Sequence, residues 1–179
     1  MTAVDRCRRC VTEAVEGVEP TSPAFALCLF PSDEPSELAP VNIALGLEGD
    51  RARALGRGTW LEAFDDVWNP TRYAYISLDE FDDPRGEPEF DAAASALVSW
   101  LGEAGVGDPA TWLLEELAAE LTRRPPLGPV TDDFVCWVFA QGRDLIASLK
   151  WILPDETQAK LAAKRLLVDD PDQLERLGP

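Results

Sequence analysis

The sequence predicts an α+β fold: an antiparallel sheet of about four strands flanked by helices, with a helical C-terminal part. Short apolar or alternating runs typical of strands, such as FVCWVF at residues 134–139, stand between longer segments with helical apolar spacing. The order of these segments is not a regular β-α-β alternation, and no glycine-rich phosphate loop follows an expected strand. A nucleotide-binding α/β fold is therefore disfavoured. The length of 179 residues and the hydrophobic content of 46% fit a single domain over residues 1–179 with a sizeable core.

The N-terminal part is expected to contain a helix and then two strands. Apolar residues recur at steps of three and four, as on one face of a helix: Val4, Cys7, Val11, Ala14 and Val18. Residues 24–30 form a continuous apolar run, and residues 41–48 alternate between apolar and other residues, so both are expected to be strands. The segment between them, FPSDEPSELAP, holds three prolines and three acids, and we expect an exposed loop between two antiparallel strands.

The middle of the chain is expected to continue with helices and a third strand. Residues 50–67 have a helical pattern that Gly56 and Gly58 break into two pieces. The motif Trp68-Asn69-Pro70 should end the second piece, because the residue before a proline is pushed out of the helical region. Alternation over residues 73–78 predicts a third strand.

The C-terminal part is expected to be mainly helical. A helical segment covers residues 89–124, a linker covers 125–130, and a strand followed by helices covers 131–179. Asp108 is expected to start the second helix of the first segment, since a capping side chain followed by proline is a helix start. Asp144 is expected to cap the helix after the strand.

The net charge of −17 is the strongest global signal. It results from 33 Asp and Glu against 16 Lys and Arg. Such a chain is repelled by nucleic acid and anionic membranes and attracts cationic partners. We therefore expect a basic protein partner and neither nucleic acid nor a membrane, although charge that serves solubility alone is an open alternative.

The cysteines and the N-terminus indicate a cytoplasmic protein with reduced thiols. The N-terminal MTAVDRCRRCVTEAVEG lacks the apolar core of a signal peptide. Four cysteines without a secretory signal point to a reducing compartment. Cys7 and Cys10 form a CxxC motif, but Cys7 lies on the apolar helical stripe, so core cysteines are favoured over a redox or zinc site.

Much catalytic chemistry is excluded by composition. The chain contains no histidine, which removes Ser-His-Asp and Cys-His arrangements and His-ligated zinc. Neither a GxSxG elbow nor a GxxxxGK[ST] loop is present. We therefore assign no catalytic residue, metal ligand or cofactor from the sequence.

The stretch SLDEFDDPRGEPEF at residues 77–90 is the main candidate site. Its acids do not match the spacing of a calcium-binding EF-hand loop. It can be a solvated loop that caps the next helix, a metal site, or a docking surface with Phe81 and Phe90 as apolar anchors. Asp65-Asp66 and Asp132-Asp133 would add acid to such a surface. The candidate partner-binding residues are Asp33, Glu34, Glu37, Asp79, Glu80, Phe81, Asp82 and Asp83.

Several short motifs resemble a known kind of family. They are FALCLF at residues 25–30 followed by an acidic loop, Pro40-Val-Asn42, Gly46-Leu-Glu48, Trp68-Asn-Pro70-x-x-Tyr73, Asp133-Phe-Val135 and Ser148-Leu149. Together they look like an uncharacterised family of acidic bacterial α+β domains that resemble the immunity-type proteins encoded beside polymorphic toxins. The resemblance implies a cytoplasmic protein whose activity is binding, with a toxin as one candidate partner, and it supplies no catalytic residues.

Three functions follow from these observations. The first is an immunity-type or regulatory module that binds a basic partner through its acidic loops. The second is a histidine-free enzyme that uses carboxylates, with or without a divalent metal. The third is a structural subunit of a larger assembly, in which exposed tryptophans, Trp60 and Trp68 above all, would matter more than the acids.

Overall fold

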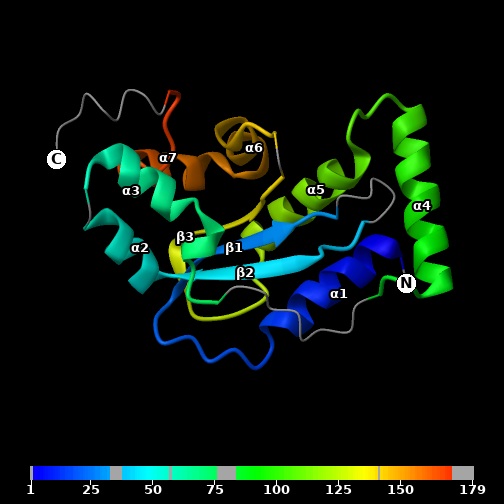
Figure 1. The fold of residues 1–179 in the computed structure, drawn as a ribbon, viewed down its shortest axis with the longest axis horizontal. Coiled ribbons are helices and arrows are strands. Elements are labelled where there is room, and N and C mark those ends of the chain that lie inside the picture. The colour runs from blue at the N-terminus through cyan, green and yellow to red at the C-terminus, as the bar shows by residue number, and fades with distance from the viewer. Residues whose placement is uncertain (1, 33–37, 57, 76–83, 141, 171–179) are drawn as a thin grey trace.

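A computed structural model of the chain describes residues 2–32, 38–56, 58–75, 84–140 and 142–170 (Figure 1). The fold is α+β, and the helices include the C-terminal part, as the sequence predicted. The described elements are, in chain order, α1 (Ala3–Val15), β1 (Ala24–Phe30), β2 (Asn42–Leu47), α2 (Glu48–Leu55), α3 (Trp60–Val67), the 3-10 turn η1 (Pro70–Arg72), α4 (Pro88–Glu103), α5 (Pro109–Arg123), β3 (Val130–Val138), α6 (Leu145–Ile152) and α7 (Asp155–Ala163).

The sheet is mixed, and the prediction of an antiparallel sheet of about four strands was wrong in detail. Within the described ranges three strands pair in the order β2-β1-β3. β1 pairs antiparallel with β2 and parallel with β3. Parallel neighbours need a crossover connection, which here contains the helices α2 to α5 between β2 and β3. The continuous apolar run of β1 is what its central position requires, because both faces of that strand are buried.

The third expected strand is reduced to one bridge where the structure describes it. Tyr75 forms an isolated antiparallel bridge with Leu45 of β2, and residues 76–78 lie outside the described ranges. The N–H of Ala74 donates 2.9 Å to the carboxylate of Asp50. The N–H of Ala74 points away from β2, because the neighbouring Tyr75 bonds to Leu45, and among the described residues of this segment Tyr75 alone pairs with β2.

The helix starts follow the capping chemistry read from the sequence. Thr2 accepts from the N–H of Asp5 and Asp5 reaches back to Thr2, a capping box that starts α1. Asp108 caps α5, whose first residue is Pro109, and Asp144 accepts from the N–H groups of Ile146 and Ala147 at the start of α6. The predictions for Asp108 and Asp144 are confirmed, as is the split of residues 50–67 into α2 and α3, whereas the Thr2 capping box was not predicted.

The helices surround the sheet unevenly. α5 packs along β3, where the Thr122 hydroxyl accepts from the N–H of Cys136 at 2.9 Å and donates to its carbonyl at 3.2 Å. α2 and α3 pack on each other at the end of the sheet where β2 leads into α2, and α4 packs on α1 and α5 at the other end (Figure 1). The buried apolar side chains of the described residues form one cluster that includes all three strands.

Close packing at one end of the sheet depends on a glycine. A Cβ on Gly46 of β2 would lie 2.7 Å from Cε1 of Phe25 and 3.2 Å from Cδ2 of Tyr73. The two rings meet edge to face at 5.5 Å beside this residue. Gly46 thus allows the aromatic contact that forms one side of the cavity described below.

Of the described helices, none combines the length and the apolar character that are needed to cross a membrane.

Candidate functional site

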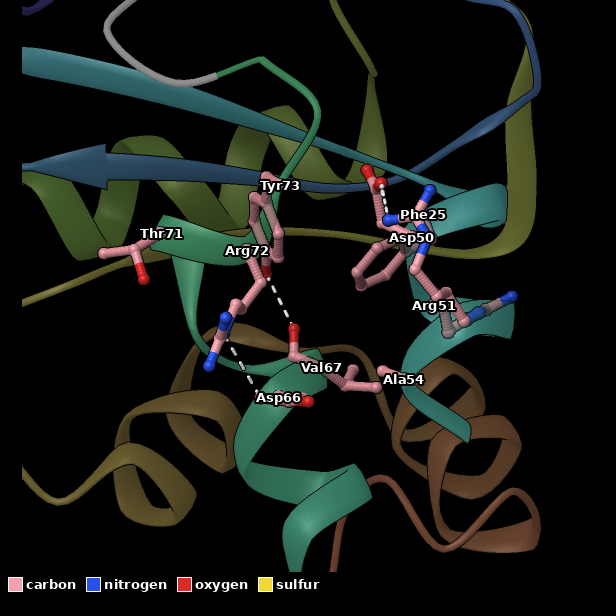
Figure 2. Close-up of a pocket in the computed structure, with 10 residues that line it drawn as sticks. Phe25, Asp50, Arg51, Ala54, Asp66, Val67, Thr71, Arg72 and Tyr73 are labelled. Carbon is pink, nitrogen blue, oxygen red and sulfur yellow. Dashed lines mark hydrogen bonds and ion pairs between the residues drawn. The ribbon is translucent and has the colours of Figure 1, made fainter. Parts of the chain in front are cut away.

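An arginine-lined cavity of about 320 Å³ lies between the end of the sheet, α2, α3 and η1 (Figure 2). Three arginines and two aspartates line it. The lining residues are Phe25, Asp50, Arg51, Arg53, Ala54, Asp66, Val67, Thr71, Arg72 and Tyr73. We call it the arginine cavity.

Asp50 joins three segments at this cavity. Its carboxylate accepts from the N–H of Leu47 at 3.0 Å and from the N–H of Ala74 at 2.9 Å. Its other oxygen accepts from the guanidinium of Arg53 at 3.0 Å. Because the side chain is buried and accepts on both oxygens, its role is to fasten the end of β2 and the segment after η1 to the start of α2.

Arg51 forms a buried ion pair behind the same wall. Its guanidinium donates 2.7 Å to Asp133 of β3, also contacts Glu48, and lies 5.1 Å from the ring centre of Phe25. Lys164 donates 2.7 Å to the same oxygen of Asp133. Burial by itself would raise the pKa of Asp133, but the hydrogen bonds from Arg51 and Lys164 lower that pKa to about 2. Asp133 is therefore ionised at neutral pH and too weakly basic to take a proton in catalysis.

The remaining polar groups of the arginine cavity also serve structure. The Tyr73 hydroxyl donates 3.0 Å to the carbonyl of Val67, and burial raises the pKa of this phenol well above its usual value. Arg72 pairs with Asp66 at 3.4 Å (Figure 2). The cavity therefore holds paired charges that lock α2, α3 and η1 to the sheet.

A second pocket, of about 350 Å³, lies between α5 and α6. Its lining combines two tryptophans with ionisable groups: Trp112, Glu115, Arg143, Asp144, Ala147, Ser148 and Trp151. We call it the tryptophan pocket. Trp151 is 60% exposed, whereas Glu115 is only 5% exposed.

The polar groups of the tryptophan pocket are unequally satisfied. One oxygen of Glu115 accepts from the Ser148 hydroxyl at 2.7 Å. The other oxygen has the guanidinium of Arg143 at 3.8 Å, an ion-pair distance that is too long for a hydrogen bond. Arg143 is also 4.0 Å from Asp108. This pocket thus presents a deeply buried carboxylate with a loosely held cation in front of it.

A smaller apolar pocket of about 80 Å³ adjoins the tryptophan pocket, with Arg143 and Ser148 common to both linings. Trp68, Trp137 and Phe139 contribute its aromatic surface. Phe139 is 46% exposed, so aromatic surface reaches solvent on this side of the molecule as well.

The predicted partner-binding residues lie outside the described part of the chain. These are Asp33, Glu34, Glu37, Asp79, Glu80, Phe81, Asp82 and Asp83. Phe90, the second expected anchor, is buried on α4 and belongs to the core, so that expectation was wrong. Asp91 accepts from the N–H of Gly86, and Glu87 pairs with Arg6 at 2.8 Å, so the described end of this stretch is a helix start.

Asp133 and the two cysteines of the CxxC motif are buried. Asp133 was counted among the surface acids, but it is 1% exposed because it neutralises Arg51 and Lys164 inside the protein. Cys7 and Cys10 are buried on α1, as expected for core cysteines, and burial raises the pKa of Cys7 to about 12. Among the described residues, Cys, Asp and Glu side chains do not gather in threes in a way that could hold a metal ion.

The most exposed tryptophans are not the two that the sequence singled out, Trp60 and Trp68. Trp68 is 4% exposed and donates 2.9 Å to the carbonyl of Leu166, and Trp60 is half-buried under the guanidinium of Arg165. The most exposed tryptophans of the described residues are Trp100 and Trp151. Both lie off the apolar stripes of their helices, so helical spacing could have identified them. The approach of Glu115 to Ser148, 33 residues later, had no signal in the sequence.

Comparison with known proteins gives no family for this chain: no protein-family model, curated protein or solved structure matches it.

Proposed function

We propose that this chain is a protein-binding module that holds a basic partner, in the manner of an immunity-type or regulatory protein. The binding surface includes the acidic segments 33–37 and 79–83, with Phe81 as an apolar anchor. The first segment connects β1 to β2 and the second precedes α4.

The distribution of ion pairs is the observation that carries this proposal. Cations throughout the described ranges pair with carboxylates of the same chain: Arg6, Arg8, Arg9, Arg51, Arg53, Arg72, Arg143, Lys150, Lys160 and Lys164. Each pair cancels one positive charge with a negative one. The excess of 33 acids over 16 bases therefore stays unneutralised by the chain itself.

An unneutralised excess of this size has a defined physical effect. It produces a negative potential that accelerates encounter with a positively charged protein and disfavours other partners. Such attraction between exposed groups is screened by salt, with a screening length of about 8 Å at physiological ionic strength. The proposed complex should therefore form fastest at low salt.

The catalytic alternative is less well supported by the described geometry. The buried ionisable groups of the arginine cavity are engaged in pairs that hold elements of the fold together. Asp133 has a lowered pKa and Tyr73 a raised one, so both keep one protonation state near neutral pH. Neither is suited to exchange protons with a substrate.

Charge reversal combined with affinity capture tests the proposal. The tagged protein is incubated with lysate of its own source at low and high salt, and bound proteins are identified by mass spectrometry. A variant with Asp79→Lys, Asp82→Lys and Asp83→Lys is compared with a control carrying Glu16→Lys, Glu19→Lys and Glu103→Lys, exposed acids whose reversal gives the same change in net charge.

The outcomes separate a docking surface from a general charge effect. The proposal expects one basic protein that is retained at low salt, shed at high salt, and lost in the 79/82/83 variant but kept by the control. Equal loss in both variants would mean that total charge governs capture and that the surface is wrongly placed. An absence of any basic protein at low salt would contradict the proposed function.

A further inference from the structure

The tryptophan pocket has features that point to a cationic ligand. Glu115 is 5% exposed, and a carboxylate this deeply buried is normally supported by several hydrogen bonds or a close cation. Here the Ser148 hydroxyl satisfies one oxygen at 2.7 Å. The second oxygen faces a guanidinium at 3.8 Å, which leaves room for a closer donor.

Arg143 lies near the carboxylates of the tryptophan pocket but forms no close hydrogen bond with them. Its distances to Glu115 and Asp108 are 3.8 and 4.0 Å, and its side chain is 42% exposed. Asp144 also lines the pocket. Two carboxylates therefore face this one cation, and Asp144, which caps α6, adds a third negative charge to the pocket lining, so negative charge is in local excess.

The tryptophans add a second kind of attraction for a cation. Indole rings attract cations through their electron-rich faces, and arginine makes such contacts more often than lysine. Trp151 and Trp112 both line the pocket, and Trp151 is 60% exposed. A guanidinium can stack on an aromatic ring and still donate two parallel hydrogen bonds to a carboxylate. The volume of about 350 Å³ is within the range of pockets that bind small ligands.

We propose that the tryptophan pocket receives an arginine side chain of the basic partner, with its guanidinium against Trp112 or Trp151 and bonded to Glu115. Arg143 occupies the entrance in the unbound protein and is displaced on binding. That the arginine belongs to a partner protein rests on the proposed function, whereas the cation preference of the pocket rests on its own geometry.

Nuclear magnetic resonance tests the pocket without the partner. The indole N–H signals of the uniformly ¹⁵N-labelled full chain are followed during titration with N-acetyl-L-arginine amide. N-acetyl-L-citrulline amide, which has nearly the same shape and no charge, is the matched ligand control. We expect a dissociation constant on the order of 1 mM for the arginine probe, with shifts of the Trp112 and Trp151 signals, and no saturable shift with the citrulline probe.

Three variants predict the direction and the size of the change in affinity for the arginine probe. Trp151→Ala removes one aromatic face and should weaken binding of the arginine probe by roughly three- to tenfold. Arg143→Gln removes the internal competitor and should strengthen binding by about two- to fivefold. Trp100→Ala, at a tryptophan of similar exposure on α4, should leave the affinity unchanged.

The results decide the two proposals separately. Equal binding of both probes, or weaker binding in the Arg143→Gln variant, would overturn the cation site, since a merely structural Arg143 cannot produce tighter binding when removed. A captured basic partner together with a pocket that ignores the arginine probe would leave the proposed function standing and refute this inference. Arginine binding without any basic partner would do the reverse.

Discussion

Arg51 on α2 donates a hydrogen bond of 2.7 Å to Asp133 on β3, a residue 82 positions later in the chain, and both side chains are almost completely buried. The pair connects the helix that follows β2 to the opposite strand of the sheet. Lys164, after α7, adds a second cation to the same carboxylate. One carboxylate thus holds together three segments that are remote in sequence.

Removing this carboxylate should destabilise the fold strongly. Asp133→Asn leaves Arg51 without its buried anionic partner and with only the half-exposed Glu48, and we expect a loss of about 3–5 kcal/mol in the free energy of unfolding by urea. The control is Asp132→Asn, because the neighbouring carboxylate is exposed and pairs with Lys160 and Lys164 at 3.9 and 3.7 Å. That change should cost less than about 1 kcal/mol, and equal losses would mean that the buried pair has no special role.

Asp133 should also make the free energy of unfolding depend on pH in the acid range. The pKa of Asp133 is lowered from 3.8 to about 2 by its cationic partners. A lowered pKa in the folded state means that the contribution is fully present above about pH 4 and is lost as the pH falls toward 2. We expect about 2 kcal/mol of stability to disappear over this range. Urea unfolding at several pH values measures it, and a wild-type slope unchanged by Asp133→Asn would contradict the assignment.

The hydrogen bonds between α5 and β3 are open to a conservative test. Thr122→Val keeps the shape of the side chain but removes the hydroxyl that bonds both backbone groups of Cys136. Two buried backbone groups would then lack a partner, so we expect a loss of about 1–3 kcal/mol in thermal or urea unfolding. Thr122→Ser retains the hydroxyl and should recover most of the difference. If the serine variant is as unstable as the valine variant, loss of the hydroxyl alone does not account for the destabilisation.

A side chain at Gly46 should destabilise the fold, and a second substitution should restore part of the lost stability. Gly46→Ala places a methyl group 2.7 Å from the Phe25 ring, and we expect destabilisation of about 1–3 kcal/mol. Phe25→Leu in the same chain should restore part of this loss, because the smaller side chain makes room. Gly107→Ala is the control, since a Cβ there meets nothing within 4 Å. A stable Gly46→Ala protein would show that the Phe25 ring shifts without cost.

The four thiols should be inert in the native protein. All four cysteines are buried, and burial raises the pKa of the Cys7 and Cys28 thiols, which removes the reactive thiolate. We expect a thiol-specific colorimetric reagent to react with them only after denaturant is added. Rapid modification of one or two thiols under native conditions would instead mean that Cys7 and Cys10 form an accessible reactive pair.

Local chemistry made much of the fold predictable. Capping residues and prolines predicted the starts of α5 and α6, and apolar runs predicted β1 and the end of β3. Strand direction was not readable, because a strand has the same alternation in a parallel and an antiparallel pair. The strand expected at residues 73–78 pairs with β2 at Tyr75, and its remainder from residue 76 on lies outside the described ranges.

The candidate sites were less predictable than the fold, since they depend on contacts between distant residues. Acidic runs are visible in a sequence, whereas the approach of Glu115 to Ser148 and of Arg143 to Glu115 exists only after α5 and α6 have packed. Tryptophans were a similar case. Trp68 lies beside a helix end and could face either way, and its indole N–H is satisfied by Leu166, 98 residues later.

The bond between Thr122 and Cys136 also limits how this protein can be recognised. Phe139 donates its N–H to Leu29 on β1. Backbone groups of successive strand residues point to alternate sides, so those of Cys136, three residues earlier, point away from β1 to the outer edge of the sheet. The threonine hydroxyl occupies both groups there. An extended peptide cannot add itself to β3 at this point, nor can a second copy extend the sheet in the way that leads to fibres. A strand that approached β3 at Cys136 would have to displace the Thr122 hydroxyl, so backbone pairing is disfavoured at this position.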